Sequence, residues 1–440
     1  MLFDPSLRRA PYAGYVYSYP HKTAHRPIRP AIPLRDVWAN EPTGSLFLYF
    51  HIPFCESRCA FCNLFSAAGA GEEMIADYIH AIDRQAEAVD RALDDSRQVA
   101  RLAIGGGTPG MLTVEQLDSL FDIAARRFGA DLRSTPTSVE LSPRTATDER
   151  LDLLRGRHVD RVSLGVQTFD AAETSRLGRP HRPDEAAAAI ERIGSYNFPR
   201  LNIDLIYGIE GQTDASWSAS LDRTLELKPE EIYLYPLYRR AETPLGETTV
   251  DDDRRLVFYR QAREALRSAR YRQISMRMFS RTEDDATAPE YCCQSDGMIG
   301  LGVGARSYTR DLHYSHPFAV RRPEVLEIIS RFVAKSTEAH GRADWGIHLD
   351  AEDRRRRFIL LSLLQVAGLS LTDYRAEFAT EATDDLPELT QLVDAGLADR
   401  STERLCLTEQ GIELSDLIGP WLFSDRVRKL MEDFQFDPIN

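Results

Sequence analysis

The chain has too few cysteines, apolar runs and basic residues for several classes of protein. Six cysteines among 440 residues cannot form the framework of a disulfide-stabilised secreted protein. No apolar run approaches the roughly 20 residues that span a bilayer, and no uninterrupted apolar stretch follows the N-terminal charges, as a secretory signal would require. Asp and Glu outnumber Lys and Arg by 68 to 54, which disfavours nucleic acid and anionic lipid as partners. We therefore expect a cytoplasmic protein with no nucleic-acid and no membrane partner.

The chain does have enough apolar sequence for a large core. Hydrophobic residues make up 43% and charged residues 28%, the composition of an ordinary globular protein. At roughly 150 residues per domain, the length indicates two or three folded units. Short apolar runs alternate with segments of helical periodicity, and these runs lie at residues 45–52, 101–107, 137–143, 161–167, 200–208 and 231–237. Such alternation predicts a parallel sheet covered by helices.

The helical segments show the expected apolar stripe. After the first run, Met74, Ile75, Tyr78, Ile79 and Ile82 fall three or four residues apart, which places them on one helix face. Beyond residue 246 the pattern becomes more helical, and the last hundred residues resemble a small winged-helix-like unit. We divide the chain into a segment covering the barrel mouth (1–43), a β/α barrel (44–246), a barrel extension and connecting region (247–345) and a C-terminal helical, winged-helix-like domain (346–440).

Three of the six cysteines lie within eight residues. Cys55, Cys59 and Cys62 follow an apolar run, and soft thiolates in one loop bind iron–sulfur clusters, zinc or copper(I). A structural zinc ion needs a fourth Cys or His; no second close ligand pair follows, although His51 lies four residues upstream of Cys55. The spacing favours an iron–sulfur cluster with one iron left open, and zinc is the alternative.

Cys292 and Cys293 are adjacent to one another, far from this trio in sequence. One interpretation makes them metal ligands or redox-active groups. Free cysteines more often pack as small buried apolar residues, so we expect packing.

Five further motifs continue the pattern. The stretch from Tyr49 through Cys62, then the segments 105–109, 138–143, 161–169 and 202–208, resemble the oxygen-independent coproporphyrinogen III oxidase family of radical S-adenosylmethionine (SAM) proteins. This resemblance implies an α/β fold: a partial (β/α)6 barrel with an additional helical region and a small C-terminal winged-helix-like domain. It also implies a [4Fe–4S] cluster on the three cysteines and two SAM molecules.

The resemblance also implies cofactor contacts. Glycines allow close approach of the backbone to a ligand, carboxylates suit ribose hydroxyls and an α-ammonium, and an arginine fork suits a carboxylate. Each polar residue taken alone could be an ordinary ion pair. No catalytic acid, base or nucleophile is assigned, because the cofactors carry the radical chemistry. The implied contacts are Tyr49, Phe61, Gly106, Gly107, Thr108, Glu140, Gln167, Arg179, Asp204, Pro236 and Gln294.

Two departures decide which branch of the family we expect. The oxidases carry a further cysteine after the third ligand, where this chain has Asn63 and Leu64. The haem-chaperone motif is missing from residues 291–302. We therefore expect a class C radical SAM methyltransferase or methylene transferase. Such an enzyme transfers a SAM-derived carbon to an sp² carbon of an aromatic or heterocyclic natural product, giving C-methylation or cyclopropanation. The alternatives are oxidative decarboxylation of coproporphyrinogen III and a haem or metal carrier without catalysis.

The expected partners follow from the same chemistry. They are a small-molecule substrate, an external one-electron reductant of flavodoxin or ferredoxin type, and a separate enzyme completing the reaction. The tyrosines at positions 15, 17 and 19 resemble a segment that folds over the barrel mouth, where a carbon radical must be shielded from water.

Overall fold

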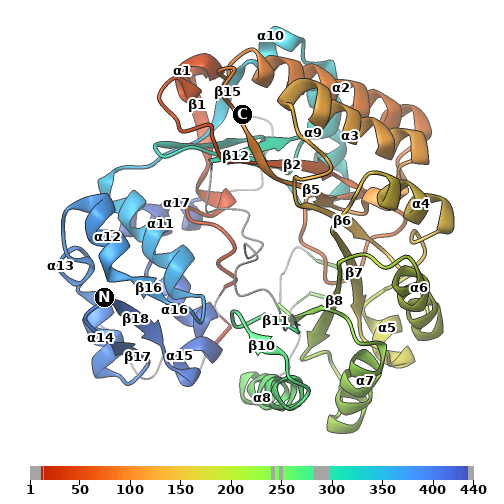
Figure 1. The fold of residues 1–440 in the computed structure, drawn as a ribbon, viewed down its shortest axis with the longest axis vertical. Helices are drawn as coiled ribbons and strands as arrows, with labels where there is room; N and C mark the ends of the chain where they lie inside the picture. The colour runs from red at the N-terminus through yellow and green to blue at the C-terminus, as the bar shows by residue number, and fades with distance from the viewer. Residues whose placement is uncertain (1–10, 13, 239–242, 247–250, 282–296, 435–440) are drawn as a thin grey trace.

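A curved sheet forms the centre of the molecule, and its middle six strands run parallel. The computed structural model describes residues 11–12, 14–238, 243–246, 251–281 and 297–434. The six strands lie side by side in chain order, and each is followed by a helix on the outside (Figure 1). They are β2 (Leu46–Ile52), β5 (Val99–Gly106), β6 (Thr137–Leu141), β7 (Arg161–Gln167), β8 (Arg200–Tyr207) and β9 (Glu231–Pro236). The predicted partial (β/α)6 barrel is therefore confirmed.

The outer helices bury the stripes that the sequence indicated. In α2, Ile75, Tyr78, Ile79 and Ile82 are all buried. Helix α3 begins with a capping box at Thr113, which satisfies N–H groups that have no partner inside the helix. In the part of the chain that the structure describes, no helix is both long and apolar enough to cross a membrane. The barrel helices are α2 (Glu72–Asp90), α3 (Val114–Phe128), α4 (Asp148–Gly156), α5 (Ala171–Arg176), α6 (Pro183–Ser195), α7 (Asp214–Leu227) and α8 (Asp252–Ser268).

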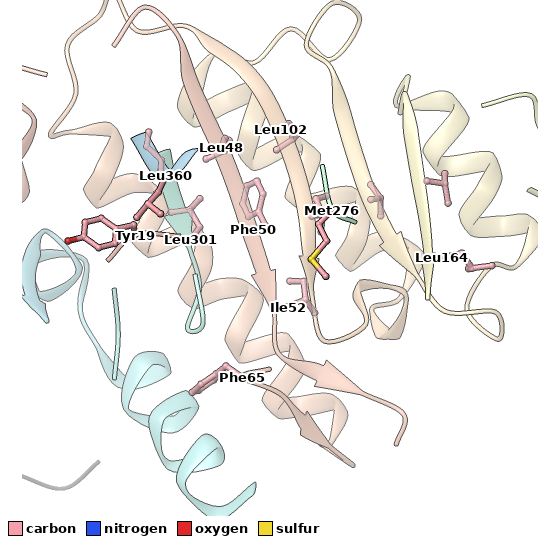
Figure 2. Close-up of a cluster of buried hydrophobic side chains, with 14 of the residues drawn as sticks. Tyr19, Leu48, Phe50, Ile52, Phe65, Leu102, Leu164, Met276, Leu301 and Leu360 are labelled. Atoms are coloured by element: carbon pink, nitrogen blue, oxygen red, sulfur yellow. The ribbon is translucent and has the colours of Figure 1, made fainter. Parts of the chain in front are cut away.

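The core is continuous from the barrel to both ends of the chain. Six of the seven residues of β2 are buried, as expected for a parallel strand covered on both faces. Figure 2 shows Leu48, Phe50 and Ile52 of this strand within one apolar cluster that also includes Tyr19 and Leu360. The N-terminal segment and the C-terminal unit therefore pack against the barrel.

The sheet is widened at both edges, by strands from the connecting region and by β1 of the N-terminal segment. At one edge β12 pairs in parallel with β2, and β13, β14, β15 and β1 follow antiparallel; at the other edge β11 and β10 extend β9. The added strands are β1 (Arg26–Pro33), β10 (Arg272–Gln273), β11 (Met278–Ser280), β12 (Gly297–Leu301), β13 (Arg306–Tyr308), β14 (Leu312–Ser315) and β15 (Arg342–His348). The helices α1 (Leu34–Trp38), α9 (Arg322–Ala334) and α10 (Thr337–His340) accompany them. Most of these strands are too short to show a period of two. Of the apolar runs in the sequence, only the one at residues 273–279 falls among them, and it overlaps β10 and β11.

The C-terminal unit combines helices with a three-stranded sheet, where the sequence predicted helices followed by a short strand. Its strands pair in the order β16, β18, β17, and they are β16 (Leu369–Ser370), β17 (Ala398–Arg400) and β18 (Arg404–Leu407). Its helices are α11 (Ala351–Leu363), α12 (Leu371–Phe378), α13 (Ala382–Asp385), α14 (Glu388–Asp394), α15 (Glu409–Glu413), α16 (Ser415–Trp421) and α17 (Asp425–Glu432). The exact division of the chain at residues 43, 246 and 345 stays a prediction.

Candidate active site

The three clustered cysteines lie in a loop at the C-terminal end of β2. The loop starts at β3 (Phe54–Cys55) and returns at β4 (Ala67–Ala68), and these two short strands pair with one another. The N–H of Ala60 donates to the carbonyl of Leu177, 2.9 Å away, and the N–H of Cys62 donates to the carbonyl of Cys59 at 3.1 Å. The loop is thus held to the barrel mouth, where β/α barrels place their ligands.

Burial opposes the ionisation of two of the thiols. All three cysteines are half-buried. Burial raises the pKa of the Cys55 thiol to about 11 and also raises the pKa of Cys62. The guanidinium of Arg179 lies against Cys59, with Nη1 3.1 Å from Sγ. Because a thiolate is the metal-binding form, bound iron would favour deprotonation of Cys55 and Cys62.

The arrangement of the thiols bears on the zinc alternative. Across the described residues, no three His, Cys, Asp or Glu side chains surround a point closely enough to hold one metal ion. The side chain of His51 is also engaged elsewhere: its Nε2 lies 3.0 Å from the carbonyl of Phe65 and its Nδ1 lies 3.2 Å from the hydroxyl of Tyr49. An iron–sulfur cluster, whose cysteines bind separate iron atoms, needs no fourth protein ligand, whereas a structural zinc ion does.

Two glycines at the end of β5 leave room beside the cysteine loop. A Cβ on Gly107 would lie 2.9 Å from Sγ of Cys55 and 2.8 Å from the carbonyl oxygen of Phe54. Gly106 has a φ of +118°, a conformation that side chains rarely tolerate. The segment therefore needs glycine for both space and backbone geometry, and it can approach a ligand closely.

A first cavity of about 170 Å³ lies between the cysteine loop and the strand ends. Eleven of the fourteen predicted metal and cofactor residues line it: Cys55, Cys59, Phe61, Cys62, Gly106, Gly107, Thr108, Glu140, Gln167, Arg179 and Asp204. Tyr49 and Pro236 do not line it: the Tyr49 hydroxyl bonds His51, and Pro236 ends β9. The prediction for Gln294, like those for Cys292 and Cys293, lies outside the described residues.

Two carboxylates face this cavity with weakened acidity. The carboxylate of Glu140 accepts the N–H of Gly106 at 3.0 Å, and Nδ2 of Asn202 donates to Asp204 at 2.8 Å. Although the Glu140 side chain is exposed to the open cavity, desolvation by the surrounding protein raises the pKa of Glu140 to about 7 and that of Asp204 to about 6, against the smaller opposing effect of those hydrogen bonds. A bound ammonium or sulfonium would favour the ionised forms, so these groups suit a cationic ligand.

Gln167 occupies the end of β7 in a strained conformation. Its φ is +76°, and the pairing of β7 with β8 shifts register between Gly165 and Gln167. A Cβ on Gly165 would lie 2.8 Å from Nε2 of Gln167. Strain of this kind gathers at ligand sites, and here it turns a buried side chain toward the first cavity.

A second cavity of about 430 Å³ adjoins the first and shares Glu140, Ser163 and Asp204 with it. Its walls come from four separate parts of the chain. Its lining includes Tyr15 and Tyr17 of the N-terminal segment, Tyr233 and Tyr235 of β9, Met276 and Arg277 beside β11, and Leu360, Gln365 and Asp416 of the C-terminal unit. The sequence did not indicate Arg277, Gln365 or Asp416. The only available signal was the alternation of Tyr233 and Tyr235, which places both rings on one face of a strand.

Comparison with known proteins identifies the architecture. Residues 49–223 match the Radical SAM superfamily, and residues 349–414 match the HemN C-terminal domain. The heme chaperone HemW of Escherichia coli is 30% identical over 272 residues, which cover 59% of this chain and 69% of that protein. The chain belongs to the HemN-like family of radical SAM proteins.

Further HemN-like proteins match over most of their length. The oxygen-independent coproporphyrinogen III oxidase of Pseudomonas aeruginosa is 27% identical over 409 residues, covering 87% of this chain and 86% of that protein. The solved structure of coproporphyrinogen III oxidase (HemN) from E. coli is 23% identical and has a TM-score of 0.75, covering 89% of this chain and 92% of that chain. This structural likeness confirms the fold.

The radical SAM superfamily uses a [4Fe–4S] cluster and SAM, and the first cavity fits both. Its three thiols, its glycine-lined edge and its two carboxylates are the donor types that a cluster, a close-lying nucleoside and an α-ammonium require. When bound, the cluster and SAM supply a carbon-centred radical by one-electron cleavage of the sulfonium. The chain's own contribution is to hold these groups in position and to shield them from water.

The prediction of methyl or methylene transfer is contradicted. The relatives that match over most of this chain are named coproporphyrinogen III oxidase or heme chaperone HemW. The prediction had given most weight to Asn63 and Leu64, two positions in one loop. Leu64 is 46% exposed, so this position is only loosely constrained by packing. Similarity along the whole chain is the stronger guide, and the names of these relatives do not support the class C branch.

Proposed function

We propose that this protein is a radical SAM enzyme that oxidatively decarboxylates a propionate-bearing porphyrinogen of the coproporphyrinogen III type. The observation that carries the proposal is the junction of the two cavities at Glu140, Ser163 and Asp204. A cofactor beside the cysteines and a substrate in the second cavity would both lie against these three residues. Relatives at 27% and 28% identity over most of the chain are named for coproporphyrinogen III, which supports this substrate class.

The second cavity has the surface that a large cyclic molecule with polar side chains requires. The rings of Tyr233 and Tyr235 stack with centroids 6.0 Å apart, and aliphatic side chains of α11 form another wall. Its volume of about 430 Å³ lies within the range of about 300–1,000 Å³ typical of ligand sites. The cavity shares Glu140, Ser163 and Asp204 with the first one, so a substrate in it would lie close to a cofactor bound beside the cysteines.

The reaction removes one hydrogen atom, one electron and carbon dioxide from each propionate and leaves a vinyl group. The hydrogen atom passes to the radical derived from SAM, and the electron passes to a one-electron acceptor. A one-electron reductant of flavodoxin or ferredoxin type starts each cycle, as expected from the sequence. The tyrosines of residues 15–17 line the reaction space, which supports their expected role in covering the barrel mouth.

The proposal is tested with anaerobically reconstituted protein, SAM, a low-potential reductant and coproporphyrinogen III. We expect 5′-deoxyadenosine to form together with a product that has lost carboxyl groups, measured by mass spectrometry. Equilibrium dialysis of labelled SAM tests the prediction of two SAM molecules, which should appear as two bound SAM molecules per cluster. Formation of 5′-deoxyadenosine with no change in the porphyrinogen would overturn the substrate assignment.

A haem carrier without catalysis is the second candidate function. It is favoured by relatives named heme chaperone HemW at 24% and 30% identity. The same incubation separates the two functions. Stoichiometric haem binding with no 5′-deoxyadenosine, from protein that holds its full complement of iron and sulfide, would establish the carrier.

A further inference from the structure

An incompletely bonded arginine faces the second cavity. Arg277 lies between β10 and β11 and is 5% exposed. Its Nη2 donates to Oδ2 of Asp416 at 2.6 Å and also contacts the hydroxyl of Tyr238. Its Nε is buried and has no hydrogen-bond partner among the described residues. The guanidinium lies 3.8 Å from the ring centroid of Tyr15, so its plane is fixed.

An unsatisfied guanidinium edge is costly inside a protein. Buried donors are nearly always bonded, and arginine stays charged at every relevant pH. Asp416 engages a single corner of the guanidinium, at Nη2. Its Nε–H remains without a partner, so the guanidinium keeps the capacity for one further charge-assisted hydrogen bond to a carboxylate.

The charges along the cavity give it two different ends. Glu140 and Asp204 lie at the end shared with the first cavity, whereas Arg277 lines the second cavity alone. The other arginine of the cavity wall, Arg161, is paired with Glu231 at 2.6 Å. The cavity therefore offers carboxylates toward the cysteines and an arginine edge toward the C-terminal unit.

We propose that Arg277 binds a carboxylate of the molecule that occupies the second cavity, and so sets how that molecule is oriented toward the cysteines. This inference deepens the proposed function and rests on it where the carboxylate is a porphyrinogen propionate. The amino-acid carboxylate of a SAM molecule has the same chemistry. Asp416 shares the guanidinium with the ligand and tunes its affinity, since its charge partly neutralises Arg277.

The test compares ligands with and without the carboxylate. Coproporphyrin III, a stable analogue, is compared with its tetramethyl ester, and SAM is compared with decarboxylated SAM. Dissociation constants are measured by anaerobic equilibrium dialysis of the holoprotein and of the Arg277→Gln, Asp416→Asn and Arg281→Gln variants. Arg281 is the matched control, because its side chain pairs with Glu230 at 3.2 Å and is 36% exposed.

We expect Arg277→Gln to weaken binding of one acid at least tenfold and to leave its carboxylate-free partner unchanged. Asp416→Asn should tighten binding of the same acid, and Arg281→Gln should change nothing. An effect confined to coproporphyrin assigns the carboxylate to the substrate, and an effect confined to SAM assigns it to the cofactor. Equal losses for acid and ester, or changes of the same sign in the Arg277 and Asp416 variants, would overturn the proposal.

Two controls separate this site from folding and from the proposed function. The Arg277→Met/Asp416→Leu pair removes both charges and keeps an apolar core, which proteins generally tolerate; it should fold and bind acid and ester with equal affinity. 5′-Deoxyadenosine formed by Arg277→Gln shows that the first cavity still works. If the wild type binds coproporphyrin through Arg277 yet never decarboxylates coproporphyrinogen, the proposed function fails and the carboxylate site stands.

Discussion

The two cavities that meet at Glu140, Ser163 and Asp204 are built on different electrostatic principles. Toward the cysteines, Glu140 and Asp204 have raised pKa values. In the second cavity, the arginines are paired with carboxylates, Arg161 with Glu231 and Arg277 with Asp416. The carboxylates of the first cavity therefore gain a charge partner when a cationic ligand binds. The arginines of the second cavity already have carboxylate partners within the protein. Substitutions in the first should change cofactor binding more than folding, and substitutions in the second should change both.

The largest effect is expected from removing one of the cluster cysteines in the first cavity. Replacing Cys55, Cys59 or Cys62 with alanine should abolish the brown iron–sulfur chromophore and SAM cleavage together, because each thiolate binds its own iron. Iron, sulfide and 5′-deoxyadenosine are measured on the same preparation. Cys406→Ala is the control, since this free and partly exposed thiol lies in β18 of the C-terminal unit. Retained cleavage in any of the three cluster variants would contradict the assignment.

The next largest effect is expected on stability, at the ion pair of the second cavity. Asp416→Ala leaves the buried charge of Arg277 uncompensated, which should lower the free energy of unfolding by about 3–5 kcal/mol. Chemical denaturation of the variant and of the Arg277→Met/Asp416→Leu pair measures this. The paired variant should recover most of the loss. If both variants are equally unstable, the loss comes from packing and not from charge.

Glu140, which lies at the end of the second cavity shared with the first, should make the stability of the protein depend on pH. The folded protein holds the proton of Glu140 up to about pH 7, above its ordinary pKa of 4.5, so this group lowers stability as pH rises between those values. Glu140→Gln cannot ionise and should gain in melting temperature relative to wild type from about pH 5 to about pH 8. Thermal unfolding of SAM-free protein measures the difference. A constant gap between the two proteins across this range would contradict the shift.

The smallest effect concerns backbone strain. Gln167 and Ala379 both have positive φ, +76° and +55°, and glycine relieves that strain while adding entropy to the unfolded chain. Gln167→Gly and Ala379→Gly should each change the free energy of unfolding by no more than about 1 kcal/mol. Only Gln167→Gly should weaken SAM binding in equilibrium dialysis, because Gln167 lines the first cavity. Weaker binding in both variants would point to a general change in the fold.

The first cavity could be predicted well because each of its parts lies in one short motif at a strand end. Cys55 to Cys62 and Gly105 to Thr108 lie at or just after strand ends, and Glu140 and Asp204 lie in the C-terminal halves of β6 and β8. Parallel strands end at one edge of a sheet. Tyr49 and Pro236 were placed at the cofactor by resemblance, yet neither lines this cavity. The prediction of the class C branch was wrong for a related reason: it relied on Asn63 and Leu64 without weighing the similarity along the rest of the chain.

The sequence by itself determined the barrel, the cysteine loop and the cofactor class, because apolar periodicity and closely spaced ligands are local properties of the chain. Only the tertiary structure brought Tyr15, Tyr235, Arg277 and Asp416 to one cavity wall. These residues come from four segments that meet through packing of the N-terminal and C-terminal parts on the barrel. No local pattern encodes such a meeting, so the place of Arg277 in the wall of the second cavity could be seen only in the folded molecule.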